Sequence, residues 1–325
     1  MRFIQKLILF FIFLLVSILI IFSFVYFDAC YIEPNWIQIN KVVIVDKDLA
    51  EVFDGYKVVQ ISDLDIDEIG YREEKLVNLI NYLNPDFLFF TGDLIDSWLY
   101  FDQVMELFKK MNIKGKIFAV TGDNDYSNIQ DMDLLQEKFK EAGVIFLRSR
   151  SLKLAGKDGK YFWLVFLDRK KDFEQAVKDI DKKYPSIFLA HYPENIYKVA
   201  DFGGDLLLAG NTQGGQVGIS WIRNLSDYAS SKLGEFVSGL YKVNNSYLYV
   251  NRGIGVSGRN IRFFCRPEIT VFKFTDKGRG TKINEPENKD KNRSLLYRLV
   301  RVIFRKMKFK QGLRHFYDSM IKFVS

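Results

Sequence analysis

The stretch Val58-Val59-Gln60-Ile61-Ser62-Asp63-Leu64-Asp65 indicates the fold of this chain. Its first four residues are mostly β-branched and apolar, which is typical of a buried strand. Two carboxylates spaced one residue apart follow this strand directly. An apolar run that stops on paired acids predicts a strand whose end supplies side chains to a functional site.

Three later segments end in a related way. Each is a short apolar run followed by acidic residues or by a histidine: 87–90 leads to Asp93 and Asp96, 117–120 leads to Asp123 and Asp125, and 187–190 leads to His191. In an open α/β sheet the carboxyl ends of neighbouring strands lie together, and ligands bind there. We therefore expect several oxygen ligands and one nitrogen ligand to gather at one edge of a sheet.

The segment from Trp36 to Thr275 alternates strands with amphipathic helices, which predicts an α/β domain. Apolar residues recur at helical spacing in 73–83, 131–143 and 173–180. Further short strands are predicted at 144–147, 162–167, 247–250 and 269–274. The helical period fades after Gly210, so the last two of these strands are predicted to form a second, more antiparallel sheet.

Histidine and cysteine are both scarce, which restricts the kind of metal site that the chain can build. The 325 residues include two histidines, His191 and His315, and two cysteines, Cys30 and Cys265. The cysteines lie far apart in the sequence, so neither a disulfide framework nor a thiolate metal site is expected. With 48% hydrophobic residues, the chain is able to bury one large core.

A membrane anchor is predicted at the N-terminus, within residues 1–30. The 21 residues 7–27 carry no charge, and at about 1.5 Å per residue they span a bilayer core of roughly 30 Å. The alternative is a cleavable signal peptide, whose apolar region is usually about 7 to 15 residues long. Arg2 and Lys6 precede the segment, and no basic residue follows it before Lys41. By the positive-inside rule, this bias places the main domain outside the cytoplasm.

A linker and a basic tail are predicted after a main domain that covers residues 31–275. Residues 276–294 are polar and rich in glycine, asparagine and lysine, as linkers often are. Residues 295–325 contain an apolar stripe at helical spacing and eight basic residues, against Asp318 alone. This pattern predicts an amphipathic helix on an anionic membrane surface, or else a solvated helix docked on the domain. Nucleic acid is not expected as a partner, because the adjacent anchor already supplies a surface.

Five motifs resemble, in order and spacing, those of the calcineurin-like metallophosphoesterases: 62–65, 92–96, 122–125, 191–193 and 210–216. In that family the motifs are Asp-x-His, Gly-Asp-x-x-Asp, Gly-Asn-His-Asp/Glu, a lone His and Gly-His-x-His. The segments 251–258 and 262–269 look like the membrane-associated bacterial branch of the family. That branch includes enzymes that cleave UDP-diacylglucosamine in lipid A synthesis.

The resemblance covers about 57–274 and implies a fold, a cofactor and a set of site residues. The implied fold is a four-layer α/β/β/α sandwich of two mixed sheets, to which the transmembrane helix and the basic tail are added. The family binds two divalent ions that activate a water for attack at phosphorus. The implied ligands are Asp93 as the bridge, Asp63, Asp65 and Gln213 on one ion, and Asp123, His191 and Asn211 on the other.

Three further residues are candidates for catalysis or for phosphate binding. Asn124 stands where the family has its catalytic histidine, and Asp125 is the second catalytic candidate. Arg262 is the candidate for phosphate binding, because a guanidinium can hold a phosphate with two parallel hydrogen bonds. The alternative for Arg262 is an ion pair at the end of a sheet.

The chain departs from the family at most of its histidine positions. Histidine is replaced at Asp65, Asn124, Asn211 and Gln213, and Asp123 replaces an asparagine. Carboxylate and amide oxygens suit Mg, Ca and Mn, whereas imidazoles suit transition metals such as Zn and Fe. We therefore expect Mn or Mg rather than Zn or Fe, bound with lower affinity. Loss of the general acid would ordinarily lower the rate by about 10² to 10⁴.

Three interpretations are compatible with these residues. The first is a membrane-anchored phosphoesterase or pyrophosphatase that acts on a lipid or nucleotide phosphate ester, UDP-diacylglucosamine among them. The second is an inactive member of the fold that binds a ligand or partner at the membrane. In the third the aspartates only end strands and cap helices, which does not explain why so many like charges crowd one edge without a cation. A lipid nucleotide in the cytoplasm conflicts with the charge bias around the anchor.

Overall fold

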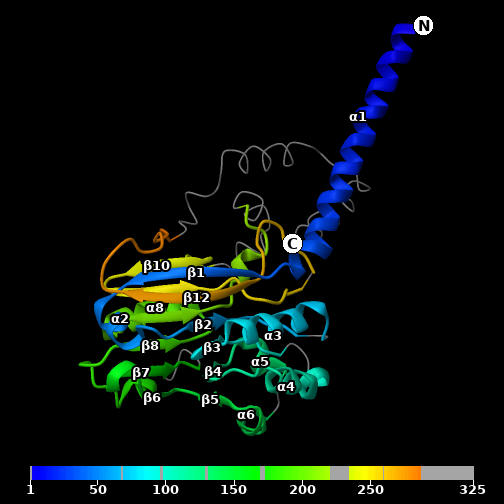
Figure 1. Ribbon diagram of the computed structural model, residues 1–325. Helices are drawn as coiled ribbons and strands as arrows, with labels where there is room; N and C mark the ends of the chain where they lie inside the picture. Colours follow the sequence, from blue (N-terminus) through cyan, green and yellow to red (C-terminus); the bar gives the residue numbers. More distant parts are fainter. Residues whose placement is uncertain are drawn as a thin grey trace, which may run out of the picture.

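Two six-stranded sheets pack face to face, and helices cover the outer face of each sheet (Figure 1). The computed structural model describes residues 2–66, 69–95, 98–128, 131–168, 173–219, 234–258 and 260–286. The layers follow the order helix, sheet, sheet, helix. The α/β/β/α sandwich of two mixed sheets implied by the resemblance is therefore confirmed.

The first sheet carries the acidic motifs at the ends of its parallel strands. Its strands lie in the order β1 (Gln38–Val45), β12 (Glu268–Thr275), β2 (Val58–Ile61), β3 (Phe87–Thr91), β4 (Lys116–Val120) and β5 (Val144–Phe146). Strands β2 to β5 are parallel, so their carboxyl ends lie at one edge. Strand β12 is parallel to β1 and antiparallel to β2.

The second sheet has a parallel centre and antiparallel edges. Its strands lie in the order β10 (Gly239–Val243), β11 (Ser246–Val250), β9 (Leu206–Ala209), β8 (Ser186–Leu189), β7 (Tyr161–Phe166) and β6 (Arg150–Ala155). Strands β7, β8, β9 and β11 are parallel, and β6 and β10 are antiparallel to their neighbours. The carboxyl ends of β8 and β9 therefore share one edge of this sheet.

The helices bury their apolar faces against the outer surfaces of the sheets, as their sequence period predicts. Helices α3 (Tyr71–Leu83), α4 (Phe101–Lys109) and α6 (Met132–Glu141) pack on the first sheet, and α7 (Phe173–Val177) and α8 (Ile196–Phe202) pack on the second. Helix α2 (Lys47–Phe53) contributes to the core between the sheets, and α5 (Asp123–Asn128) follows β4. Short 3₁₀ turns lie at Trp98–Tyr100, Lys157–Gly159, Pro193–Asn195 and Gln213–Gly215.

Phenylalanine dominates the core between the two sheets. Phe87 and Phe118 from the first sheet meet Phe162 and Phe166 from the second. Ring centroids of Phe87 and Phe162 are 5.6 Å apart, and those of Phe118 and Phe166 are 6.1 Å apart. Aromatic pairs at these distances add to the stabilisation that comes from burial alone. This core joins the sheets firmly, so their carboxyl ends are held at a set distance from each other.

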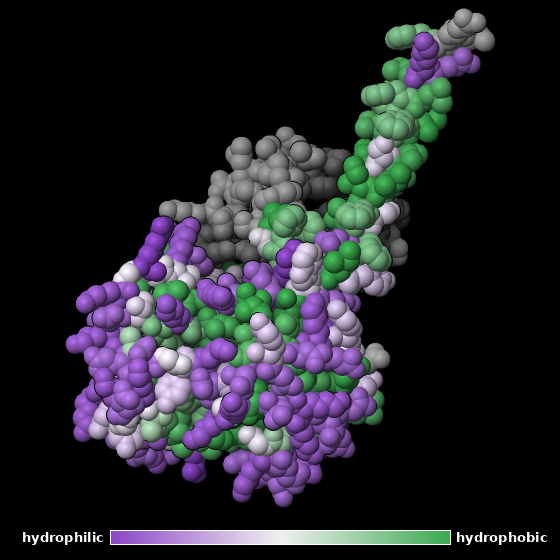
Figure 2. Space-filling model, viewed as in Figure 1, coloured by the Kyte–Doolittle hydropathy of each residue, from purple (hydrophilic) through white to green (hydrophobic). Residues whose placement is uncertain are grey.

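Helix α1 (Arg2–Phe27) leaves the domain as a long apolar rod (Figures 1 and 2). At about 1.5 Å per residue its 26 residues are roughly 39 Å long, enough to cross a bilayer core. The most apolar 18-residue window of the segment Phe3–Asn35 has a mean hydropathy of 3.2, and none of it is buried in the protein. A π-helical turn, η1 (Asp28–Ile32), and a 3₁₀ turn, η2 (Glu33–Asn35), lead from α1 into the domain.

Most of the predicted strands and helices occur, but the C-terminal strand lies in a different sheet from the one expected. The run 269–274 was expected in the second sheet, and β12 instead completes the first sheet between β1 and β2. Alternating side chains of β12 face two different cores, with Ile269 toward α3 and Phe272 toward the second sheet. The predicted basic helix at 295–325 lies outside the described residues, and the domain boundaries remain predictions.

The position of β12 between two cores gives a matched pair of substitutions. Phe272 is buried against Tyr249, with ring centroids 5.2 Å apart, while its neighbour Lys273 is exposed. We expect Phe272→Ala to lower the free energy of unfolding by about 3 kcal/mol or more, because it leaves a cavity between the sheets. Lys273→Ala should change it by less than about 0.5 kcal/mol. Urea unfolding of the full chain in detergent measures both, and equal midpoints would contradict this placement of β12.

Candidate metal centre

Five strand ends from the two sheets meet at one place. Strands β2, β3 and β4 of the first sheet lead to Asp63, Asp93 and Asp123. Strands β8 and β9 of the second sheet lead to His191 and Asn211. The residues that the motifs predicted as ligands are therefore brought together, although they come from both layers of the sandwich.

Hydrogen bonds tie these strand ends to one another. The backbone N–H of Asp63 donates to the carbonyl of Gly92 at 3.0 Å. One carboxylate oxygen of Asp93 accepts the backbone N–H of Asn124 at 3.0 Å. The carboxylate of Asp63 accepts the backbone N–H of Asn211 at 3.0 and 3.1 Å. The acidic side chains are thus held by neighbouring loops as well as by their own strands.

Glycine precedes three of the site residues because the loops approach too closely for any side chain. A Cβ atom on Gly122 would lie 2.0 Å from a carboxylate oxygen of Asp93, and one on Gly210 would lie 1.9 Å from the hydroxyl of Ser62. Gly92 has a φ of +93°, which residues with a side chain rarely adopt. The glycines of the motifs are therefore required by packing around the acids.

Several of the site residues hold backbone conformations that are uncommon for residues with a side chain. Positive φ values occur at Asp63 (46°), Asp65 (41°), Asp93 (49°), Asn211 (71°) and Gln213 (48°). Aspartate and asparagine tolerate this region better than other residues do, but each such residue still costs free energy. Strain of this kind persists where the surrounding structure holds it, and it is often concentrated at functional sites.

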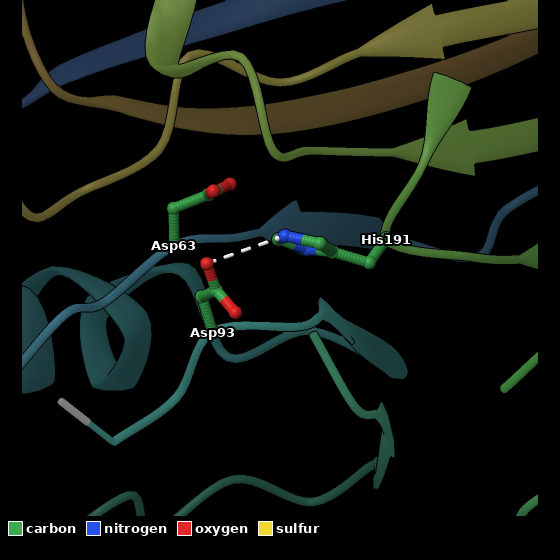
Figure 3. A group of neighbouring side chains, drawn as sticks. All are labelled: Asp63, Asp93 and His191. Atoms are coloured by element: carbon green, nitrogen blue, oxygen red, sulfur yellow. Dashed lines mark ion pairs between the residues drawn. The ribbon is translucent and has the colours of Figure 1, made fainter. Parts of the chain in front are cut away.

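Asp63, Asp93 and His191 form a compact cluster of possible ligands (Figure 3). One ligand atom from each lies within 4.8 Å of the others, and all three residues are buried. A fourth candidate, Asp123, places its Oδ1 3.1 Å from Nε2 of His191. The Asp123 side chain is 53% exposed, so solvent reaches the cluster from its side.

His191 is oriented as a metal-binding histidine would be. Its Nδ1 lies 2.9 Å from the carbonyl oxygen of Thr91, to which it donates as a neutral ring. A hydrogen bond of this kind leaves the lone pair on Nε2. Nε2 lies 3.3 Å from Oδ2 of Asp93 and 3.1 Å from Oδ1 of Asp123, but within the described residues it has no hydrogen bond of acceptable geometry. A cation at this point would satisfy all three groups.

The pKa shifts of Asp63 and His191 also favour a cation in this cluster. Burial raises the pKa of Asp63 to about 6, His191 opposes this rise, and the carboxylate of Asp93 adds to it. Burial also opposes the charge on His191, but the neighbouring carboxylates raise the pKa of its imidazole well above the ordinary value. Buried like charges are unfavourable unless a proton or a cation joins them. These residues therefore fit a divalent cation.

Two other predicted ligands, Asp65 and Gln213, form a separate hydrogen-bond network with Asn124. The side-chain amide of Asn124 donates to Oδ1 of Asp65 at 3.0 Å, and the side-chain amide of Gln213 donates to Oδ2. The amide oxygen of Gln213 accepts the backbone N–H of Ser257 at 3.0 Å. Two donors thus compensate the charge of Asp65 without a cation. Asp63, Asp93, Asp123 and His191 therefore form a cluster that fits a cation. Asp65 and Gln213 belong instead to a network that is satisfied by hydrogen bonds.

Asp125 connects the loops that carry the cluster. Its Oδ1 accepts the backbone N–H groups of Leu94 and Ile95 at 2.9 and 3.1 Å, and its Oδ2 accepts that of Gly122 at 2.8 Å. Burial and the carboxylate of Asp93 raise its pKa to about 7, against the effect of these three donors. The contacts make Asp125 a positioning residue, and the catalytic role predicted for it remains a prediction.

Within the described residues, Arg262 directs its side-chain N–H groups to backbone carbonyls of its own loop. It is fully buried, and its guanidinium donates to the backbone carbonyls of Gly255, Cys265 and Arg252 at 2.6 to 3.0 Å. These bonds use Nε and both Nη atoms. The geometry therefore favours a role in holding its loop over the phosphate contact predicted from the sequence.

The sequence patterns gave no signal for two groups that contact the candidate ligands. The carbonyl of Thr91 orients His191, and the backbone of Ser257 orients Gln213. Both contacts are made by the main chain, so the residue type carries no information about them. These contacts form only in the tertiary structure, where loops from distant parts of the chain come together.

The known proteins that are similar to this chain include metallophosphoesterases. A family model described as calcineurin-like phosphoesterase matches residues 56–224, more than half of the chain. The uncharacterized metallophosphoesterase YkuE of Bacillus subtilis is 28% identical over 253 residues, which is 75% of this chain and 87% of that protein.

Two further relatives have names that state an activity. The UDP-2,3-diacylglucosamine pyrophosphatase LpxG of Chlamydia muridarum is 23% identical over 304 residues, which is 75% of this chain and 91% of that protein. The phosphodiesterase YaeI of Escherichia coli is 25% identical over 254 residues, which is 75% of this chain and 90% of that protein. The resemblance found in the five motifs is therefore confirmed.

Cation binding at the compact cluster leads to a measurable change in stability. We expect Mn²⁺ or Mg²⁺ to raise the Tm of the full chain, since a ligand at about 100 times its Kd stabilises a folded protein by about 2.7 kcal/mol. Asp93→Asn should remove most of this rise, because it takes one charge from the centre of the cluster. Asp54→Asn removes one charge from an exposed loop and should leave the rise intact. An unchanged rise in Asp93→Asn would show that the cation binds elsewhere.

Proposed function

Because the chain belongs to the calcineurin-like phosphoesterase family, whose members are hydrolases acting on phosphoester bonds, we propose that it is a membrane-anchored, metal-dependent hydrolase of phosphate or pyrophosphate esters. The observation that carries this proposal is the buried cluster of Asp63, Asp93 and His191 at the meeting point of both sheets. Oxygen-rich clusters of this kind bind divalent cations, and phosphoester hydrolysis in such sites depends on them.

Asp63, Asp93, Asp123 and His191 would hold the divalent ions. When bound, such ions lower the pKa of a coordinated water and neutralise the charge that develops on the phosphoryl oxygens. Two hydrogen bonds hold these ligands in place. The backbone N–H of Asn211 donates to the carboxylate of Asp63, and Nδ1 of His191 donates to the carbonyl of Thr91. Three carboxylates and one imidazole favour Mn or Mg over Zn or Fe. Two ions are proposed by analogy with the family.

Asn124 restricts the kind of leaving group that this site can expel. An amide does not donate a proton at neutral pH, so the alcohol or phosphate that leaves must do so as an anion or take its proton from water. A pyrophosphate bond releases a phosphate ester, whose second pKa is about 6. An ordinary alcohol leaves as a far stronger base. The asparagine therefore favours a pyrophosphate substrate over a simple alkyl phosphate.

The proposed substrate is a lipid or nucleotide that carries such a bond. LpxG, one of the relatives, is named as a pyrophosphatase of UDP-2,3-diacylglucosamine, and a compound of this class is the specific proposal here, which would give the chain a role in lipid A synthesis in bacteria. The exposed apolar helix α1 supports a single-pass anchor. The charge bias around α1 places the domain outside the cytoplasm, whereas a cytoplasmic lipid nucleotide requires the opposite side. A periplasmic or cell-surface ester is consistent with both the anchor and the bias.

A second function is favoured by the network around Asp65. Asn124 and Gln213 both donate to this carboxylate and replace histidines of the family, so the half of the site that contains them is stable without a cation. A protein with one retained cation site and no general acid is suited to binding a phosphorylated ligand without cleaving it. Both functions use the compact cluster to bind a cation. In this alternative the bound phosphate ester is not hydrolysed.

Hydrolysis of bis-p-nitrophenyl phosphate by the full chain in detergent tests the proposed activity. We expect the reaction to require Mn²⁺ or Mg²⁺, to stop when EDTA is added, and to be lost in Asp93→Ala. The exposed control Asp54→Ala should keep the wild-type rate. If the cation binds but neither this diester nor a nucleotide pyrophosphate ester is cleaved, the binding function is correct and hydrolysis is wrong.

The dependence on the leaving group tests the role of Asn124. We expect Asn124→His to raise the rate for diphenyl phosphate, whose phenol leaves poorly, by up to about 10²-fold, the lower end of what a general acid contributes. The gain for bis-p-nitrophenyl phosphate should be much smaller, because nitrophenolate leaves without a proton. Asn124→Gln, which cannot supply a proton either, is the matched control. Equal gains on both esters would show that position 124 acts through binding.

A further inference from the structure

Two segments that are far apart in the sequence lie together at the base of α1 (Figure 1). The first, here called the connector, is 28–36 and follows α1 directly. The second, here called the rim loop, comprises 251–258 and 260–267 and joins β11 to β12. In Figure 1 the yellow to orange rim loop runs beside the blue end of α1.

The connector and the rim loop are joined by several hydrogen bonds. The backbone N–H of Arg262 donates to the carbonyl of Ala29 at 2.9 Å. The carboxylate of Glu33, which is only 6% exposed, accepts the backbone N–H groups of Phe264 and Cys265 at 2.9 and 2.5 Å. A buried carboxylate with two backbone donors is a strong and specific contact. The rim loop is therefore fixed to the end of α1.

The rim loop is fixed equally well to the metal centre. The backbone N–H groups of Ile254 and Gly255 donate to the carbonyl of Asp63 at 3.1 and 2.7 Å. At the next turn, Ser257 donates to the side chain of Gln213 at 3.0 Å. One loop thus contacts the residues of the candidate centre at one end and the base of α1 at the other.

Large aromatic side chains are exposed where these two segments meet. Tyr31 is 60% exposed, Trp36 is 49% exposed and Phe264 is 69% exposed; we call these three residues the collar. The guanidinium of Arg266 lies 3.6 Å from the ring centroid of Trp36. Tyrosine, tryptophan and arginine together are typical of the headgroup level of a membrane.

The collar continues the apolar surface of α1. The rings of Phe27, the last residue of α1, and Tyr31 stack with centroids 5.2 Å apart. In Figure 2 the apolar rod of α1 reaches the base of the helix, whereas much of the domain face in view is hydrophilic. Single exposed aromatics such as Tyr82, at the far end of α3, are normal for a soluble surface. Several exposed aromatic residues grouped at the end of a membrane-length helix indicate instead a surface that binds a partner.

We propose that the collar docks into the headgroup region of the bilayer that α1 enters, and that the rim loop thereby holds the metal centre beside the membrane surface. The partner is the lipid bilayer, because the collar is continuous with a helix whose side chains are suited to its interior. This inference rests on α1 as the membrane anchor of the proposed function. It holds for either orientation of α1, since the connector follows the helix on whichever side the domain lies. A substrate attached to lipid would then reach the centre without leaving the bilayer.

Fluorescence quenching by labelled lipids tests this arrangement in the full chain. Phe264→Cys is labelled with the environment-sensitive dye NBD and reconstituted in nanodiscs of phosphatidylcholine and phosphatidylglycerol, some of whose lipids carry a nitroxide near the headgroup end of the acyl chain. Ser23→Cys in α1 is the control for insertion, and Tyr82→Cys, at a position that is 83% exposed, is the control for the solvated surface. The unaltered chain corrects for labelling of Cys30 and Cys265, both of which are buried.

We expect strong quenching of the dye at positions 23 and 264 and little at position 82. Quenching at 23 without quenching at 264 would overturn the docked collar while leaving the anchor in place. No quenching at 23 would remove the anchor, and this inference with it. Hydrolysis of the soluble diester depends on neither result, so a failure of the collar is distinct from a failure of the proposed enzymatic activity.

Discussion

The structure depends on one electrostatic constraint, which is the crowding of carboxylates around the buried imidazole of His191. Nε2 of this ring faces the oxygens of Asp93 and Asp123, and its Nδ1 is already bonded to a backbone carbonyl. Such a group is stable only with a proton or a cation at its centre. The surrounding fold supports it at a cost, through left-handed backbone at several ligands and through glycines that leave no space for a Cβ atom.

The replacement of histidines is not scattered evenly over the site. Asp63 and Asp93, beside His191, keep the acids of the family, and Asp123 adds an acid where the family has an asparagine. Asp65, Asn124 and Gln213, in contrast, have become a network that is satisfied by its own hydrogen bonds. A carboxylate with two amide donors has less need of a cation than one that faces other carboxylates. The chain therefore combines a conventional cation cluster with an altered proton-donor position, which is the physical basis for favouring a substrate with an easily expelled leaving group.

The same topology connects the site with the membrane-length helix. Strand β12 returns to the first sheet between β1 and β2, so the loop before it must cross the carboxyl edge of the sheets next to the connector. There the loop donates to Asp63 on one side and to Glu33 on the other. Buried Arg262 holds the loop together through three backbone carbonyls. A chain of hydrogen bonds thereby connects the end of α1 with residues of the candidate metal centre.

The sequence alone determined the class of fold, the membrane-length helix and the acids that meet at the strand ends, because apolar period and motif spacing are local properties of the chain. It did not determine that β12 joins the first sheet, since a strand with apolar residues on both faces fits either sheet. Nor could it divide the ligands into a cluster around His191 and a network around Asp65. Those partners come from strands and loops as much as 148 residues apart, and only tertiary packing decides which side chain faces a cation and which faces an amide.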